Sequence, residues 1–133
     1  KGAELNPIDP SWGTPLHLAA EQAQVEVVKF LLRKGARVNL TNPSWGHTPL
    51  HRAAWGPVVR RFGQEAEDLG ADPNPDYKKI VAILVAEGAE INARDHEGET
   101  PLDQAIEGGS DETVTLLKRY GGKTSKELKV DGK

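Results

Sequence analysis

The chain of 133 residues contains no cysteine and no methionine. Without thiolates it has no disulfide bond, no thiolate zinc site and no cysteine nucleophile, and either redox compartment suits it. Because the first residue is not methionine, we expect the chain to begin after a processed residue or inside a longer protein. A signal segment removed beforehand is compatible with this start.

Aromatic residues make up only 5% of the chain, while apolar residues make up 37%. This composition predicts one soluble globular domain without a large single core. No apolar run approaches the roughly 20 residues that a membrane helix needs. The net charge is −3 and no basic stripe stands out, so we expect neither a membrane nor a nucleic acid as partner.

A short motif is present in two copies, Thr14–His17 and Thr48–His51, and returns altered at Thr100–Asp103. Each copy is followed by an apolar run that ends in a glycine; the glycines are Gly35, Gly88 and Gly121. Four residues after the first two of these glycines stand Asn39 and Asn92. Gly2 precedes Gly35 by 33 residues. A chain that repeats at this period is an array, and arrays usually bind other molecules rather than transform them.

These motifs closely resemble the ankyrin repeat, a turn-helix-turn-helix unit of about 33 residues with a Thr-Pro-Leu-His start. The resemblance covers nearly the whole chain. It implies an all-α ankyrin-repeat solenoid, with helix-turn-helix units joined by β-hairpin-like loops. It also implies a protein–protein interaction module in the cytoplasm, whose partner lies on a concave groove of hairpin tips and first helices.

In the repeat frame, residues 1–13 are the end of a preceding repeat or a bare hairpin arm, and we favour a longer natural protein. Repeat 1 spans 14–46, repeat 2 spans 47–99, a capping repeat spans 100–124, and a frayed tail spans 125–133. In repeat 1, Thr14 and Pro15 suit the start of the first helix and Gly35 the end of the second. In the capping repeat, polar residues are expected on a wet outer face; they are Asp103, Gln104, Glu107, Asp111 and Glu112.

Repeat 2 is too long. Thr48 precedes Gly88 by 40 residues, whereas the other two units have 21 in this interval, an excess of 19. We place an insertion at about 57–75, with an amphipathic helix of its own. A second register, in which Gly70 ends a unit, remains open but gives a poor core helix. Long loops are often functional, and the acidic residues of the insertion leave a metal or small-ligand sensor as an alternative.

Histidines His17 and His51 in the motif invite a catalytic or metal-binding interpretation. The resemblance implies instead that they form hydrogen bonds around the turn and to neighbouring units. His47 and His51 are four residues apart, but Pro49 starts a helix between them, so we do not expect a shared metal. Phosphate loops, nucleophile motifs and metal-ligand clusters are absent from the sequence. We therefore expect no enzyme, no cofactor and no metal.

Tryptophan is enriched at interface hot spots. Trp12 and Trp45 fall in two Pro-Ser-Trp-Gly turns, and Trp55 follows Ala53-Ala54. The repeat frame assigns all three to the groove, although each tryptophan would equally suit a role covering its own turn. The frame adds a polar rim of Glu21, Gln22, His47, Arg52, Arg94, His96 and Glu99. The expected partner is a protein, and the chain itself a monomer or weakly self-associating. A regulatory or oligomerising segment of a larger enzyme is the alternative.

Overall fold

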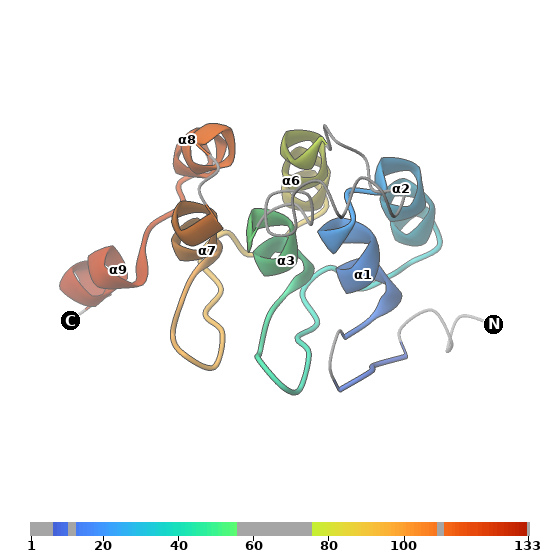
Figure 1. The fold of residues 1–133 in the computed structure, drawn as a ribbon, viewed down its shortest axis with the longest axis horizontal. Helices are drawn as coiled ribbons and strands as arrows, with labels where there is room; N and C mark the ends of the chain where they lie inside the picture. The colour runs from blue at the N-terminus through green and yellow to red at the C-terminus, as the bar shows by residue number, and fades with distance from the viewer. Residues whose placement is uncertain (1–6, 11–12, 56–75, 109–110, 133) are drawn as a thin grey trace, which may run out of the picture.

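The helices form two rows, and loops project from one side of the inner row (Figure 1). The computed structural model describes residues 7–10, 13–55, 76–108 and 111–132. The inner row consists of α1 (Pro15–Glu21), α3 (Pro49–Trp55) and α7 (Pro101–Gly108), and the outer row of α2 (Val25–Arg33), α6 (Tyr77–Ala86) and α8 (Asp111–Arg119). Neighbouring helices pack along each row. This is the all-α solenoid of helical units that the repeated motif predicts. The insertion expected at about 57–75 lies outside the described residues.

Each inner helix of the first two units starts with the same arrangement. The Thr14 hydroxyl accepts a hydrogen bond from the His17 N–H at 3.4 Å, and His17 Nδ1 accepts one from the Thr14 N–H at 3.0 Å. Thr48 and His51 repeat both bonds at 3.2 and 3.1 Å. The threonine thus satisfies a free donor of the first turn, and the proline that follows it lacks the N–H that would be unpaired there. The Thr-Pro-Leu-His motif therefore defines where these helices begin.

The same histidines link each unit to the next. His17 Nε2 lies 2.7 Å from the His47 carbonyl oxygen, and His51 Nε2 lies 2.9 Å from that of Glu99. A carbonyl only accepts, so Nε2 carries the proton, and Nδ1 is free to accept from threonine. Burial lowers the pKa of His17 to about 4, which keeps this neutral tautomer at neutral pH. The expectation of a structural role for these two histidines is confirmed.

Packing along the outer row leaves the first unit different from the others. Ile80 of α6 is fully buried, whereas Val27, at the same position of α2, is 42% exposed. Phe30 is 48% exposed, while its counterpart Ile83 is partly buried against the core. The reason is that α2 covers α6, while among the described residues no helix covers α2 from the other side. Each outer helix after the first thus depends on its predecessor for burial.

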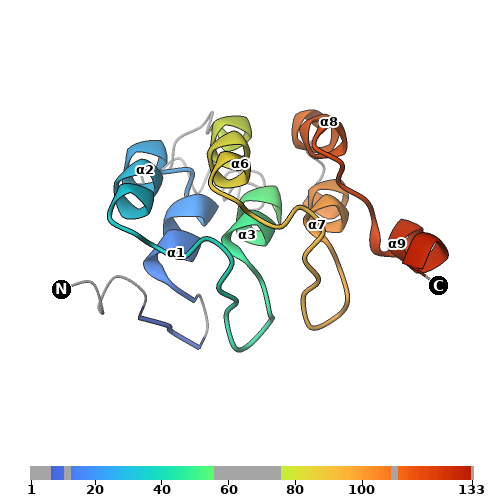
Figure 2. The same ribbon diagram turned by 180° about the vertical axis from the view of Figure 1, so that it is seen from behind.

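Residues 125–132 are helical, which corrects the expectation of a frayed tail. Helix α9 (Ser125–Gly132) continues the inner row after α7, as Figure 2 shows from behind. The Thr124 hydroxyl accepts from the Glu127 N–H at 3.1 Å, and the Glu127 carboxylate accepts from the Thr124 N–H at 2.8 Å. This capping box is visible in the sequence Thr-Ser-Lys-Glu and was missed there.

Asp103, which stands where the earlier units have histidine, links α7 to α9. Its carboxylate accepts from the Thr100 N–H at 3.0 Å and from the Ser125 N–H at 2.9 Å. The Thr100 hydroxyl meanwhile donates to the Lys123 carbonyl at 2.6 Å. Asp103 therefore links its unit to the next element as the histidines do, but it accepts a main-chain hydrogen bond where the histidines donate one.

Asparagines at the constant distance after glycine also join neighbouring units. The Asn39 side chain donates to the Gly88 carbonyl at 3.0 Å and accepts from the Glu90 N–H at 2.9 Å. Asn92 does the same for Gly121 at 3.3 Å and Lys123 at 2.7 Å. A side-chain amide is suited to this position because it offers a donor and an acceptor on one planar group.

We expect Asn39→Ala to lower the free energy of unfolding by about 1–2 kcal/mol, because two hydrogen bonds between units are lost at an exposed site. Asn39→Asp keeps the acceptor for Glu90 and loses the donor to Gly88, so its loss should be smaller than that of alanine. Urea unfolding followed by circular dichroism measures both. Equal stability of the parent and Asn39→Ala would contradict a role in joining the units.

Candidate functional site

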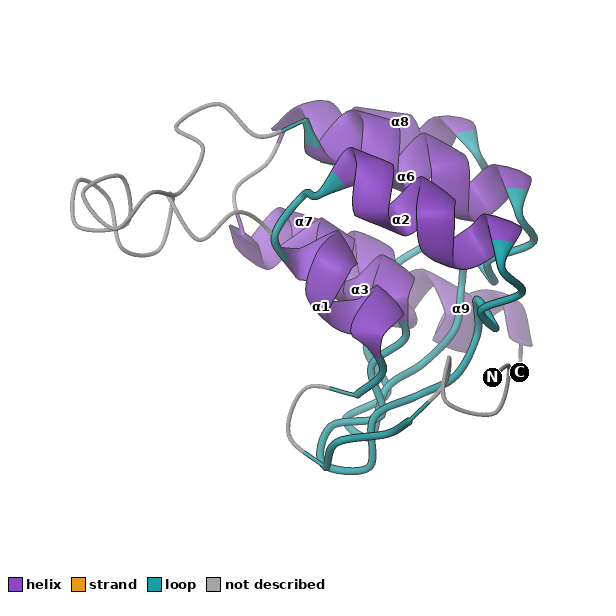
Figure 3. Cartoon of the chain, turned by 90° about the vertical axis from the view of Figure 1, so that its right-hand side faces the viewer, coloured by secondary structure: helices purple, strands orange, loops and turns teal. Residues whose placement is uncertain are grey.

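Loops precede α1, α3 and α7, and all of them project in the same direction from the inner helices (Figure 3). The second is closed by the Asn42 N–H, which donates to the His47 carbonyl at 3.0 Å. The third is closed by the Asp95 N–H, which donates to the Glu99 carbonyl at 2.9 Å. The Asp95 carboxylate also accepts from the N–H groups of Glu97 and Glu99, both at 2.9 Å. The tips are therefore held by their own polar groups.

Neighbouring tips are hydrogen-bonded to each other. The Ser44 N–H donates to the Pro10 carbonyl at 3.2 Å, and the His96 N–H donates to the Trp45 carbonyl at 2.9 Å. Gly46 has φ +73°, and a Cβ there would lie 2.9 Å from the His96 main-chain nitrogen. Only glycine fits this close approach without strain. The loops thus form a stiff edge along the array.

Aromatic rings are stacked where the second tip meets α3. The Trp45 and His47 rings are 6.2 Å apart at 14°, and the His47 and His51 rings are 5.3 Å apart at 21°. His51 is fully buried, whereas Trp45 is 52% exposed. The stack therefore carries a fixed aromatic surface outward from the core.

A chain of polar contacts crosses the three units between the tips and the inner helices. Arg52 Nη2 forms an ion pair with Glu21 Oε1 at 2.7 Å, and Arg52 Nη1 lies 3.4 Å from His47 Nδ1. His47 Nε2 lies 3.2 Å from Asp95 Oδ2. His47 thus bridges a cation and a carboxylate, accepting on one ring nitrogen and donating on the other.

The contacts continue through Gln104, whose Nε2 lies 3.4 Å from Asp95 Oδ2 and donates to Glu99 Oε1 at 2.7 Å. Gln104 was expected on the wet outer face, which is wrong: it is 2% exposed. Its side chain lies on the inner helix facing the hairpin, where the carboxylates hold it. We call the six residues the polar strip: Glu21, Arg52, His47, Asp95, Gln104 and Glu99.

Burial holds the pKa of His47 well below its ordinary value, and the charges of His51 and Arg52 lower it further, although Asp95 opposes them. His47 is therefore neutral at neutral pH. In that state it donates to Asp95 without adding a charge of its own. The charged members of the polar strip are therefore Arg52 and the carboxylates of Glu21, Asp95 and Glu99.

The last part of the polar strip is crowded with carboxylates. Burial raises the pKa of Glu99, and the nearby carboxylates add to this rise; they are Glu107, Asp95, Asp103 and Glu97. A raised pKa means that the charged form is destabilised where it lies. The cation Arg52 of the strip is already paired with Glu21. The polar strip is therefore balanced in charge where Arg52 pairs with Glu21, and negative at Asp95 and Glu99.

The sequence-predicted residues fall into two groups. Glu21, His47, Arg52 and Glu99 are brought together in the polar strip, and Trp45 is stacked against it. Gln22, Arg94 and His96 are exposed, and Trp55 is half-buried at the end of α3. Trp12 lies outside the described residues.

The sequence analysis did not identify Asp95 as a site residue and placed Gln104 on the wrong face. These two residues extend the polar strip into the third unit. A signal for Asp95 was available. Asp95 begins its hairpin as Asn42 begins the previous one, and both are buried residues whose side chains close the loop. No comparable signal marked Gln104, because glutamine is common on exposed helix faces.

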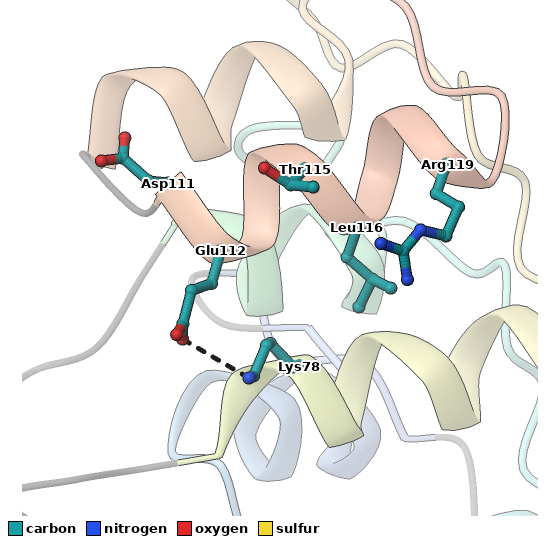
Figure 4. A pocket seen from close by; sticks show the side chains of 6 residues that line it. All are labelled: Lys78, Asp111, Glu112, Thr115, Leu116 and Arg119. Atoms are coloured by element: carbon teal, nitrogen blue, oxygen red, sulfur yellow. Dashed lines mark ion pairs between the residues drawn. The ribbon is translucent and has the colours of Figure 1, made fainter.

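A shallow pocket lies elsewhere, between the outer helices α6 and α8 (Figure 4). Its lining consists of Lys78, Asp111, Glu112, Thr115, Leu116 and Arg119. Lys78 and Glu112 form an ion pair at 3.6 Å with both side chains largely exposed. Such a pair contributes little binding or stability, so the groove is the stronger candidate.

Within the described residues, no group of three or more histidine and acidic side chains is arranged to hold a metal ion. The helices of the same part of the chain include none long and apolar enough to cross a membrane. The described site thus consists of the hydrogen-bonded side chains of the polar strip and the half-exposed Trp45.

Comparisons with known proteins agree with this architecture. A family model described as ankyrin repeats in three copies matches residues 1–75. Alpha-latrotoxin-Lt1a of Latrodectus tredecimguttatus is 33% identical over 109 residues, covering 82% of this chain and 6% of the toxin. Human transient receptor potential cation channel subfamily A member 1 is 31% identical over 132 residues, covering 88% of this chain and 12% of the channel. Its Caenorhabditis elegans homolog is 35% identical over 106 residues, covering 76% and 9%. The chain therefore spans only a small part of these relatives.

Proposed function

Because the chain belongs to the ankyrin-repeat family, whose members are generally protein-interaction modules, we propose that it binds a partner protein along the groove between the hairpin tips and helices α1, α3 and α7. The main observation in support of this proposal is the exposure of Trp45 to solvent. Half of this large side chain is open to solvent, yet its main chain is hydrogen-bonded to the next tip and its ring is stacked on His47.

Rigid support of this kind favours binding. A partner that covers Trp45 removes a large apolar area from water, and little conformational entropy is lost because the tip is already ordered. The polar strip supplies fixed donors and acceptors beside the ring. In this proposal the array acts as a preorganised surface, and the chemistry of recognition lies in Trp45 and the groove of the second and third units.

Two alternatives carry less support. A regulatory segment of a larger enzyme would bind through the same groove. This alternative therefore changes the protein in which the array is found and leaves the mode of binding the same. A metal sensor based on the acidic insertion rests on residues that lie almost entirely outside the described part of the chain. The exposure of Trp45 and the fixed polar strip beside it support the protein-binding proposal over these two alternatives.

Affinity capture from a lysate of the source organism tests the proposal. We expect Trp45→Ala to weaken capture of the partner at least tenfold, since tryptophans at interface centres are typical hot spots. Phe30→Ala is the matched control, because Phe30 is exposed to a similar extent on the outer helix α2. A triple variant of Trp12, Trp45 and Trp55 extends the test to all three predicted positions.

Circular dichroism must first show that each variant is folded. Equal capture by the parent and the folded triple variant would contradict binding at the groove. Loss of capture by Phe30→Ala, with Trp45→Ala unchanged, would move the interface to the outer row.

A further inference from the structure

The third unit contains more carboxylates than its fold needs for hydrogen bonds. Asp95 closes its hairpin and accepts from two main-chain N–H groups, and Asp103 joins Thr100 to Ser125. The other three nearby carboxylates have no comparable structural role. Within the described residues, Glu97, Glu99 and Glu107 form no ion pair, and only Glu99 of the three is hydrogen-bonded through its carboxylate, to Gln104.

Gln104 adds a second, independent observation. Its side chain is almost fully buried, and its Nε2 is directed to Glu99 and Asp95. Its Oε1 is buried without a hydrogen-bond partner among the described residues. A buried amide oxygen without a donor is costly.

Trp45 lies at the same end of the groove. It is joined to the third hairpin through the His96 N–H and, through His47 and Asp95, to the Gln104 amide. One face of the indole is turned to His47, and half of the side chain is exposed. An exposed indole and carboxylates that form no ion pair among the described residues each attract a planar cation, because the ring face is negative and the carboxylates accept its N–H groups.

We propose that the third-unit end of the groove binds a basic segment of the partner protein, with an arginine placed between Trp45 and Glu99. This inference rests on the proposed function of the groove and names the chemistry of what it holds. Arginine suits the place better than lysine, since its guanidinium stacks on a ring while its several donors serve Glu99, Glu107 and the free Gln104 oxygen. Charge complementarity to the cluster sets the register of the segment along the groove.

A defined peptide system tests this proposal. A phage library of random 12-residue peptides is selected on the parent chain and counter-selected on folded Trp45→Ala. We expect the surviving peptides to be enriched in arginine. One such peptide is then synthesised together with a copy in which citrulline, which keeps the shape and loses the charge, replaces arginine. Titration calorimetry should show binding at least roughly tenfold weaker for the citrulline peptide.

Variants of the chain locate the contact. Glu99→Gln with Glu107→Gln should weaken binding of the arginine peptide roughly tenfold and reduce its dependence on salt. Glu87→Gln, at an exposed position after α6, is the matched control and should bind as the parent does. Because the carboxylates repel one another, the double variant should also be at least as stable as the parent.

The outcomes separate this inference from the proposed function. Selected peptides without basic residues, or an arginine peptide bound equally well by the double variant, would overturn the inference while the groove remains a binding site. The inference would also fail if no peptide were enriched. Lysate capture that depends on Trp45 would then still support the groove, and its absence would overturn both.

Discussion

Replacing Ile80 with alanine should lower the free energy of unfolding by about 2–5 kcal/mol. Ile80 is fully buried in the outer row, where α2 covers α6. Alanine removes three carbon atoms and leaves a cavity between two helices that pack along the row, so the lost transfer free energy and the cavity both destabilise the fold. Urea unfolding monitored by circular dichroism measures the loss.

Val27→Ala is the control, because Val27 occupies the same position of α2 and is 42% exposed. We expect it to cost less than about 1 kcal/mol, as is usual for exposed positions. The extra methylene group of isoleucine accounts for only about 1 kcal/mol of the difference. If both variants lost the same stability, burial between units would not be what holds the outer row together.

Acidification should begin to destabilise the fold at about pH 6.5, before most carboxylates titrate. Burial lowers the pKa of His17 to about 4 and also lowers the pKa of His47 and His51. Above the unfolded pKa of about 6.5 both states are neutral. Below it the unfolded chain takes up protons that the folded chain does not, so stability falls as the pH drops from about 6.5 towards 4. His17 alone should contribute roughly 2 kcal/mol of this loss between pH 7.5 and pH 5.

His17→Gln separates titration from the lost hydrogen bonds. Glutamine does not titrate, so the free energy of unfolding of this variant should be lower at pH 7.5 but should fall less steeply with acid. Chemical unfolding at a series of pH values gives the slope for each protein. Equal slopes for the parent and His17→Gln would show that His17 does not resist protonation in the folded state.

The polar strip was predictable in part from sequence. The Thr-Pro-Leu-His motif locates the inner helices, and the resemblance to the ankyrin repeat assigns Trp45, His47 and Glu99 to the expected partner-facing edge. The repeat frame also placed Glu21 and Arg52 on that edge, and the structure pairs them. Trp55 was placed in the groove by the same argument but is half-buried at the end of α3.

Other features depend on contacts that no local pattern reveals. Gln104 is polar and lies in a unit rich in acidic residues, so its sequence suggests solvent, yet the third hairpin folds over it and buries it against Asp95 and Glu99. Asp103 differs from its histidine counterparts, and only the position of Ser125 shows that it still links one unit to the next.

The sequence alone determined the repeat and the starts of the inner helices, because these depend on residues a few positions apart or on a fixed period. The tertiary structure alone decided which polar side chains meet across three units, and therefore where the polar strip is neutral and where it is negative. Such contacts join residues far apart in the chain, as in the contact between His47 and Asp95. Their geometry exists only once the units have stacked, since each unit buries its faces on its neighbours.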